Sequence, residues 1–259
     1  MTPRPPLSAY FRTLNEAGHI EESVRAALKV AREVIVVDSG STDGTQDLAR
    51  AAGATVVPND WPGSGRQKRF AEERCSYDWL LDLDADEVVS DELAREIEEL
   101  FARGEPRFAV YALPWVTVPP FGAPWRRVDR NWRTKLYDRR RLRVPDHPAW
   151  DQLEVDKRRA PRLSGPLYHH AFTDIGDLTR KVERNMTGRA KGVEQKPLAW
   201  LRLRIALGLP VYVLKRYLLR GLWRKGTYGF AFCVAQGYGR WLKDVKLYER
   251  HMRDRGGRA

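Results

Sequence analysis

Short apolar runs and amphipathic stretches alternate through the first hundred residues. Short, mostly apolar runs predict strands at residues 7–11, 33–37, 54–57 and 78–83. The run at residues 33–37 is rich in β-branched side chains and has no alternation, which fits a strand buried on both faces, as in a parallel sheet. Apolar positions at spacings of three and four predict helices, at residues 20–28, 45–52, 67–74 and 90–100. This alternation predicts the α/β class, with an open sheet and right-handed crossovers.

The second half of the chain follows a different pattern. Shorter strand-like segments and long loops are predicted over residues 108–167, and a helical, basic and aromatic region over residues 176–253. The longest apolar run, residues 205–214, has ten residues. Because a membrane-spanning helix needs about 20 apolar residues, this run is too short to cross a bilayer, although it could lie on one.

Charge separates the same two regions. Residues 1–100 contain 11 Lys and Arg and 20 Asp and Glu residues, which gives a net charge of −9. Residues 101–259 contain 35 Lys and Arg and 14 Asp and Glu residues, which gives a net charge of +21. An apolar content of 42% excludes a disordered chain, and two cysteines exclude a disulfide scaffold. The basic half predicts a polyanionic partner: nucleic acid, anionic lipid or a phosphorylated substrate.

Acidic side chains gather where the fourth predicted strand ends, at Asp84, Asp86 and Glu87. Neighbouring carboxylates repel one another, and a divalent cation relieves that repulsion. Mg²⁺ and Mn²⁺ prefer carboxylate oxygens and share them with phosphates. Asp84 and Asp86 project the same way in strand geometry, so both are candidate metal ligands. The alternative is a solvated turn before a helix that begins at Ser90.

Two further loops follow predicted strands, and ligands of open α/β sheets bind beyond the carboxyl ends of strands. Asp38 comes directly after the second strand, where it can accept hydrogen bonds from a ribose or a base. An ordinary strand-to-helix loop, capped by Thr42 or Asp43, is the alternative. Residues 13–16 could hold the edge of a base, although a plain turn is the simpler interpretation. We expect these loops and the acidic cluster to share one rim.

These segments resemble the family 2 inverting glycosyltransferases of the GT-A fold. The shared order is Asn-Glu at residues 15–16, Val-Val-Asp-Ser-Gly-Ser-Thr-Asp-Gly-Thr at residues 36–45 and Leu-Asp-Ala-Asp-Glu at residues 83–87. Trp-Pro-Gly-Ser-Gly-Arg-Gln-Lys at residues 61–68 is similar to the lipopolysaccharide-core β-glucosyltransferase branch. Residues 125–172 carry a weaker likeness.

The resemblance implies a fold and a division of the chain. The fold is α/β of the GT-A type, a Rossmann-like open sheet, with a C-terminal helical extension. The implied catalytic domain covers residues 1–175, with a nucleotide-binding half at residues 1–100 and an acceptor-side half at residues 101–175. The extension covers residues 176–259.

The resemblance also implies roles for residues that bind the nucleoside of a sugar nucleotide. Asn15, Glu16 and Asp38 would contact the nucleoside, and Asp43 would shape its pocket.

The same resemblance implies a phosphate and metal site. Asp84 would lie near the ribose and the metal, Asp86 would ligate the metal, and Lys68 would meet a phosphate or organise the pocket. His169 would approach the diphosphate or the metal, with a structural histidine as the alternative. The implied cofactor, Mg²⁺ or Mn²⁺, would neutralise charge on the leaving diphosphate.

An inverting transfer needs a base that deprotonates the acceptor hydroxyl. The candidates are carboxylates of the second half, namely Asp129, Asp138, Asp146, Asp151 and Glu154. In the family the base lies in a loop after the mixed strands, which matches residues 147–154, so we choose Asp151 first and Glu154 second. Trp150 departs from the family pattern, because a polar residue is common there. A surface-loop carboxylate is the alternative interpretation.

The basic extension has three interpretations: a membrane-surface anchor, a pair of helices that packs or oligomerises, and a nucleic-acid binder. Trp and Tyr prefer the membrane interface, and no nucleic-acid motif is present. We therefore predict contact with an anionic membrane surface, no nucleic acid, and a homo-oligomer as the alternative. Residues 1–6 lack an apolar signal segment, which predicts a cytoplasmic protein, peripheral on the inner face of the plasma membrane.

The predicted function is metal-dependent, inverting sugar transfer. The donor is a nucleoside diphosphate sugar, expected to be UDP-linked, such as UDP-glucose, and the acceptor is a hydroxyl of a lipid-linked glycan such as lipopolysaccharide core. One alternative is a nucleotidyltransferase of related fold, which usually has a Gly-rich phosphate loop where residues 12–18 contain only Gly18. The other is a non-catalytic adaptor that binds membranes or polyanions.

Overall fold

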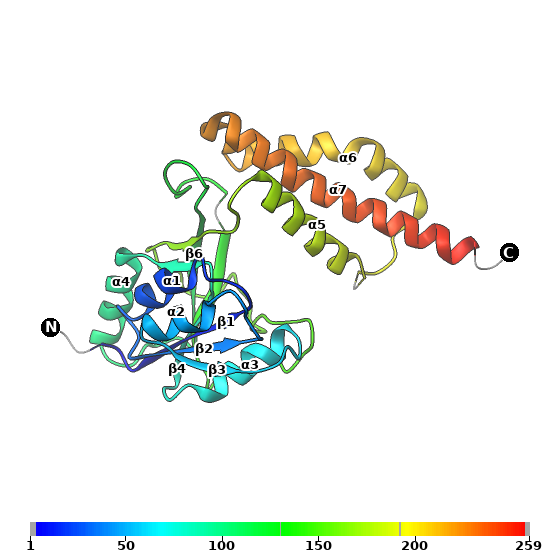
Figure 1. Ribbon diagram of the computed structural model, residues 1–259. Helices are drawn as coiled ribbons and strands as arrows, with labels where there is room; N and C mark the ends of the chain where they lie inside the picture. Colours follow the sequence, from blue (N-terminus) through cyan, green and yellow to red (C-terminus); the bar gives the residue numbers. More distant parts are fainter. Residues whose placement is uncertain (1–3, 130, 192, 257–259) are drawn as a thin grey trace. The chain divides into compact units, whose positions relative to one another are not determined.

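The computed structural model describes residues 4–129, 131–191 and 193–256. The chain forms two compact units (Figure 1). The sheet unit comprises residues 1–118 and 131–170, and the helical unit comprises residues 119–130 and 171–259. Each unit has its own apolar core, so each is described by itself.

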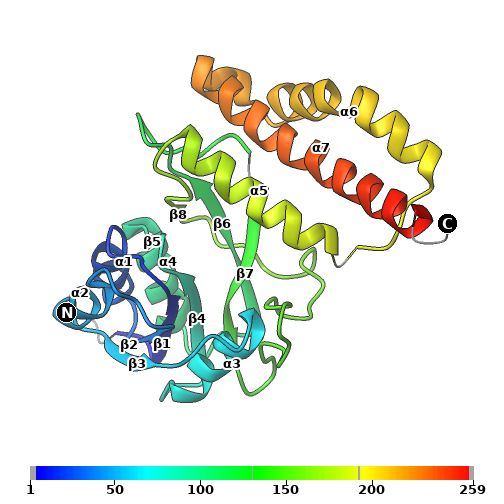
Figure 2. The ribbon, with the colours of Figure 1, turned by 45° about the vertical axis from the view of Figure 1, so that its right-hand side comes forward.

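The sheet unit is built on eight strands in the order β3-β2-β1-β4-β7-β6-β8-β5. Their bounds are β1 Leu7–Thr13, β2 Glu33–Asp38, β3 Thr55–Pro58, β4 Trp79–Asp84, β5 Glu87–Val89, β6 Val110–Thr117, β7 Asn131–Asp138 and β8 Leu167–His169. Strands β1 to β4 run parallel to one another, whereas β7 pairs antiparallel with β4 (Figure 2). The predicted open α/β sheet is confirmed.

Four helices belong to the sheet unit: α1 Ile20–Ala27, α2 Thr45–Ala51, α3 Ser64–Arg74 and α4 Asp91–Ala102. The start of α4 follows from its sequence, because the Ser90 hydroxyl accepts a hydrogen bond from the Leu93 N–H at 3.0 Å. Asp91 and Glu92 in the first turn favour the same helix end through its dipole.

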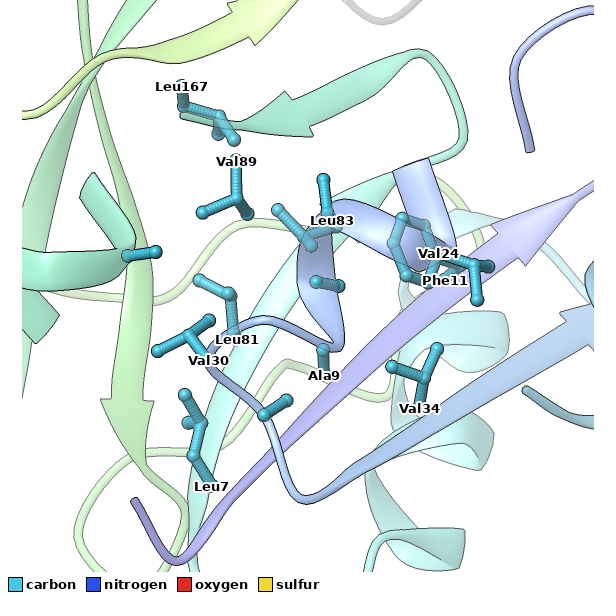
Figure 3. Close-up of a cluster of buried hydrophobic side chains, with 14 of the residues drawn as sticks. Leu7, Ala9, Phe11, Val24, Val30, Val34, Leu81, Leu83, Val89 and Leu167 are labelled. Atoms are coloured by element: carbon cyan, nitrogen blue, oxygen red, sulfur yellow. The ribbon is translucent and has the colours of Figure 1, made fainter. Parts of the chain in front are cut away.

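The core of the sheet unit follows the two-residue period of β1. Leu7, Ala9 and Phe11 point to one face, where they pack with Val24 of α1 and Leu83 of β4 (Figure 3). Tyr10 points to the other face and belongs to a second apolar cluster. Each buried large side chain contributes about 1.5–3 kcal/mol, so this packing holds the carboxyl ends of the central strands in fixed positions.

Three long helices make up most of the helical unit: α5 Ile175–Lys191, α6 Leu198–Leu219 and α7 Gly226–Gly256, with a short 3₁₀ helix, η1 Leu222–Lys225, before α7. Two glycines of α7 allow close packing. A Cβ atom at Gly237 would lie 2.7 Å from Val213 of α6, and one at Gly239 would lie 2.1 Å from Val182 of α5. None of the helices among the described residues is both long and apolar enough to cross a membrane.

Residues 119–130 lie in the helical unit, which differs from the predicted division of the chain. Trp125 and Val128 are buried in the apolar cluster of the helices, and the Trp125 ring meets Phe232 edge-on with centroids 4.9 Å apart. Asp129 forms an ion pair with Arg216 of α6. The segment follows β6 in the sequence but obtains its apolar and ionic partners from α6 and α7.

Candidate active site

Three parallel strands end together at one edge of the sheet. Thr13 of β1 lies beside Asp38 of β2, and Arg12 of β1 lies beside Asp84 of β4. The loops that we expected to share a rim therefore begin at adjacent strand ends. This edge is the candidate active site.

Asp38 is fully buried and organises the loop that follows β2. It accepts hydrogen bonds from the Thr13 and Ser41 hydroxyls, the Gly40 and Ser41 N–H groups and the Gln46 amide. Burial would raise the pKa of Asp38, but the hydrogen bonds outweigh it and lower the pKa. A carboxylate has about four lone-pair sites, so a direct bond to a nucleoside requires one of these donors to leave.

The loop after β1 is connected to the loop after β2 by three predicted site residues. Asn15 accepts a hydrogen bond from the Thr42 N–H at 2.9 Å, and Asp43 accepts one from the Ala17 N–H at 3.0 Å. The Glu16 N–H donates to the Thr45 hydroxyl at 2.8 Å. Asp43 also accepts from the Thr45 N–H at 3.1 Å, at the N-terminus of α2. Asn15, Glu16 and Asp43 therefore lie together on the rim beside Asp38.

Asp84 lies between two cations. Its carboxylate is 3.2 Å from the Arg12 Nε and 3.2 Å from the Lys135 Nζ of β7. Burial would raise the pKa of Asp84, but the charges of Lys135, Lys68 and Arg12 hold it well below its usual range. The repulsion that suggested a divalent ion is thus partly relieved by cations of the chain itself.

Glu87 is the buried anchor of this arrangement. It accepts hydrogen bonds from the Lys135 Nζ at 2.6 Å, the Trp115 Nε1 at 2.6 Å and the Asp84 N–H at 2.9 Å. Burial raises the pKa of Glu87, and the charge of Lys135 offsets only part of that effect. Glu87 therefore fixes the turn that carries the acidic cluster.

Asp86 and His169 form a second group on the rim. The His169 Nε2 lies 3.3 Å from the Asp86 carboxylate, and the imidazole stacks on Trp115 with centroids 3.8 Å apart. The His169 Nδ1 is buried and has no hydrogen-bond partner among the described residues. Carboxylate oxygens suit Mn²⁺ and Mg²⁺, and a neutral imidazole is a common metal ligand. Mg²⁺ is usually held by one or two carboxylates together with substrate phosphates. Asp86 and His169 therefore fit a metal that also takes oxygens from a diphosphate.

The predicted metal set of Asp84, Asp86 and His169 is not one ligand group. Over the part of the chain that the structure describes, no three His, Cys, Asp or Glu side chains are grouped to hold a metal ion. The reason is that Arg12 and Lys135 occupy the Asp84 carboxylate, whereas Asp86 pairs with His169.

Asp151 reaches the same rim through Arg12. The Asp151 Oδ2 lies 2.8 Å from the Arg12 guanidinium and 3.8 Å from the Lys68 Nζ. Lys68 itself is buried and forms a 2.7 Å ion pair with Asp82. Glu154 is exposed and takes part in none of these contacts.

The glycines of residues 61–68 explain how the Asp151 loop is positioned. The Ser64 N–H donates to the Pro148 carbonyl at 3.0 Å, and the Gly65 N–H donates to the His147 carbonyl at 3.1 Å. A Cβ atom at Gly65 would lie 2.2 Å from the Trp150 carbonyl oxygen. Only glycine allows the loop before Asp151 to lie this close to the start of α3.

The other candidate bases have different partners or positions within their own units. Asp129 pairs with Arg216 in the helical unit, and Asp138 lies beside Trp79, at the opposite end of β4 from Asp84. Asp146 is exposed and contacts Arg66 at 3.1 Å. Of the five carboxylates, the structure connects Asp151 to the rim through Arg12.

Arg12 and Lys135 are the site residues that sequence reasoning missed. The available signal was the acidic cluster, which requires nearby positive charge. Nothing local in the sequence tells which of the 46 Lys and Arg residues supplies it, because β7 joins β4 only in the folded sheet.

Comparisons with known proteins relate this chain to glycosyltransferases. The family model described as glycosyl transferase family 2 matches residues 8–153. An uncharacterized glycosyltransferase of Rickettsia bellii is 32% identical over 255 residues, which cover 94% of this chain and 86% of that protein. The lipopolysaccharide core biosynthesis glycosyltransferase LpsC of Rhizobium meliloti is 27% identical over 258 residues, which cover 97% of this chain and 95% of that protein.

Among solved structures, the glucosyl-3-phosphoglycerate synthase of Mycobacterium tuberculosis, in complex with Mn²⁺, UDP and glucosyl-3-phosphoglycerate, is 24% identical with a TM-score of 0.35. The match covers 44% of this chain and 44% of that chain, which is less than half of either.

Proposed function

Because the chain belongs to glycosyl transferase family 2, we propose that it is an inverting enzyme that moves a sugar from a UDP-linked donor, such as UDP-glucose, to a hydroxyl of a lipid-linked glycan. The observation that carries this proposal is the position of Arg12. Its guanidinium contacts Asp84, the predicted donor-side carboxylate, and Asp151, the predicted base. The two sides of a transfer reaction would therefore meet at one side chain.

On the donor side, the loops after β1 and β2 would hold the nucleoside, with Asn15, Glu16 and Asp43 on the rim and Asp38 beneath them. Asp86 and His169 would hold Mg²⁺ or Mn²⁺. The bound ion would neutralise negative charge on the departing diphosphate. Lys135 and Arg12 would keep Asp84 ionised beside it.

On the acceptor side, Asp151 would act as the base. Among the described residues, both of its cations reach it through Oδ2, so Oδ1 is available to accept the hydroxyl proton. As that proton leaves, the acceptor oxygen bonds to the anomeric carbon, and the bond from that carbon to the diphosphate oxygen breaks. The nucleoside diphosphate departs with the electron pair, and attack from the opposite face inverts the configuration.

The similarity to LpsC over nearly the whole chain supports lipopolysaccharide core as the acceptor class. Such an acceptor is lipid-linked, and a nucleotide-sugar donor is cytoplasmic. We therefore propose that the enzyme acts on the inner face of the plasma membrane.

Calorimetry with UDP tests the donor site. We expect UDP binding that requires Mn²⁺ or Mg²⁺. We expect Asp86→Ala to abolish this metal-dependent binding. Asp47→Ala is the matched control, because Asp47 is an exposed carboxylate of α2 that pairs with Arg50. If UDP fails to bind with or without metal, the proposal is wrong.

A screen of nucleotide sugars for slow, metal-dependent hydrolysis identifies the donor and tests the chemistry. We expect release of a nucleoside diphosphate; release of pyrophosphate would instead indicate a nucleotidyltransferase. Asp151→Asn should lower transfer at least about a hundredfold while metal-dependent UDP binding is retained. Equal losses in Asp151→Asn and Glu154→Gln would contradict the assignment of the base.

A further inference from the structure

The helix α6 is apolar on two opposite faces. One face is buried in the helical unit through Leu201, Gly208 and Val213. The other forms a stripe of six apolar side chains, each between 49% and 57% exposed: Trp200, Leu203, Leu207, Val211, Leu214 and Leu218. Their spacings of three and four place them in one row along the helix, which we call the α6 stripe.

The α6 stripe continues beyond the end of α6. Leu219 is 77% exposed, and Trp223 of η1 is about half exposed. Single exposed apolar residues are ordinary, but a contiguous apolar row indicates a surface that is covered in use. Tryptophans lie near both ends of the row, as is typical of helices that lie in a membrane interface.

The charge around the α6 stripe is mainly positive, although Arg204 pairs with Asp244 and Arg216 pairs with Asp129. Residues 195–243 contain ten Lys and Arg residues and no Asp or Glu. A small pocket between α6 and α7 is lined by Lys215, Arg216, Arg220 and Arg240, together with Tyr212 and Gln236. We call it the cationic pocket, and no carboxylate contributes to its lining.

Lys215 joins the two features. It lies four residues after Val211 and three residues before Leu218, so it is their neighbour on the helix surface. It also lines the cationic pocket. Apolar surface for a lipid chain and positive charge for a phosphate are therefore side by side.

We propose that the helical unit binds the surface of an anionic lipid bilayer. The α6 stripe lies among the upper parts of the acyl chains, with α6 in the plane of the interface, and the cationic pocket receives a lipid phosphate. Each cation near an anionic leaflet strengthens such binding about fivefold.

Charge complementarity favours a bilayer over a second copy of the chain. Two copies joined through the α6 stripe would bring two sets of cations together, and residues 195–243 offer no carboxylate to compensate them. An anionic leaflet supplies negative charge along the whole row.

Flotation of the full-length protein with vesicles tests the proposal. Vesicles of phosphatidylcholine with 30 mol% phosphatidylglycerol (about a third anionic lipid, enough for a negative surface) are compared with phosphatidylcholine alone. We expect binding to the anionic vesicles that weakens as salt rises. Equal binding to both vesicle types, or none to either, would overturn the proposal.

Two variants separate the apolar and cationic contributions. The triple variant Leu203→Gln, Leu207→Gln and Leu214→Gln changes only exposed positions. Because the loss of one apolar anchor should already weaken vesicle binding about tenfold, the triple variant should weaken it at least tenfold. Lys215→Gln should weaken it about fivefold. Matched controls in the sheet unit are Phe108→Gln and Arg158→Gln, both exposed, and both should bind as the parent protein does.

Two further measurements distinguish membrane binding from self-association and from a defect in the donor site. Light scattering without lipid reports the oligomeric state. If the parent protein is a dimer that the triple variant disrupts, and if neither vesicle type is bound, the α6 stripe is a self-association surface and the proposal is wrong. Metal-dependent UDP binding should be unchanged in every variant of the helical unit. This readout separates failure of membrane binding from failure of the proposed function.

Discussion

The two units of the molecule differ in how far their positive charges are paired with carboxylates. At the rim of the sheet, Arg12, Lys68 and Lys135 each contact two carboxylates. In the helical unit, residues 195–243 contain ten cations and no carboxylate, although Arg204 and Arg216 pair with Asp244 and Asp129 outside that range. Charges compensated within a fold hold a site in shape, whereas uncompensated charges favour a partner of opposite sign.

The largest effect should come from removing one compensated cation. Lys135→Met leaves Asp84 and the buried Glu87 without their shared partner, and breaking a buried ion pair on one side costs about 3–5 kcal/mol. Urea unfolding of the variant measures this loss. Lys215→Met, which removes an exposed cation of the helical unit, should change the free energy of unfolding by less than about 0.5 kcal/mol. Similar losses of unfolding free energy in both variants would contradict the proposed difference between paired and unpaired cations.

Asp38 should show the next largest effect, and it depends on pH. Asp38→Asn replaces a carboxylate that accepts several hydrogen bonds, so we expect a loss of about 2 kcal/mol at pH 7. The folded protein lowers the pKa of Asp38, so its contribution is present above the unfolded value of about 3.9 and is lost as pH falls. The difference in unfolding free energy between parent and variant should therefore shrink below about pH 4. A difference that is constant from pH 3 to pH 7 would contradict this.

Gly65→Ala should affect activity more than stability. The added Cβ would meet the Trp150 carbonyl oxygen and displace the loop that carries Asp151, and a displacement of about 1 Å can lower a rate up to a hundredfold. We expect kcat to fall at least about tenfold while metal-dependent UDP binding changes less than twofold. Gly188→Ala, which adds a Cβ atom in open space on α5 of the helical unit, is the control and should leave kcat unchanged.

The smallest effect concerns the two buried cysteines, one in each unit. Burial raises the pKa of Cys75 to about 12 and that of Cys233 to about 11. At pH 8 both thiols are therefore almost entirely protonated, and a thiol reagent should react slowly with both of them in the folded protein. The Cys75→Ala and Cys233→Ala variants assign the two rates, and full reactivity in denaturant is the control. Fast reaction at Cys75 would show that the sheet unit opens more readily than the helical unit.

The sequence predicts those parts of the fold that depend on local pattern. Apolar runs such as residues 33–37 predict parallel strands, and in the structure this run is almost entirely buried. The shared rim was predicted because parallel strands end at one edge, and β1, β2 and β4 do end there. Family membership is confirmed over residues 8–153.

The parts that sequence analysis missed depend on contacts between distant segments. The repulsion within the acidic cluster was recognised, but Lys135 supplies part of the compensation from 48 residues away along the chain. Residues 119–130 join the helical unit because Trp125 meets Phe232, more than 100 residues later. A local pattern shows that a charge or an apolar ring needs a partner, but not which partner it finds.

The position of Arg12 has a thermodynamic consequence for the order of binding. One guanidinium donates a hydrogen bond to Asp84 and forms an ion pair with Asp151. A donor that draws it toward Asp84 would therefore release Asp151, and an acceptor that engages Asp151 would release Arg12 toward the donor. Linkage requires both influences to be equal in free energy. Each substrate would then raise or lower the affinity for the other by the same factor, without any movement of the backbone.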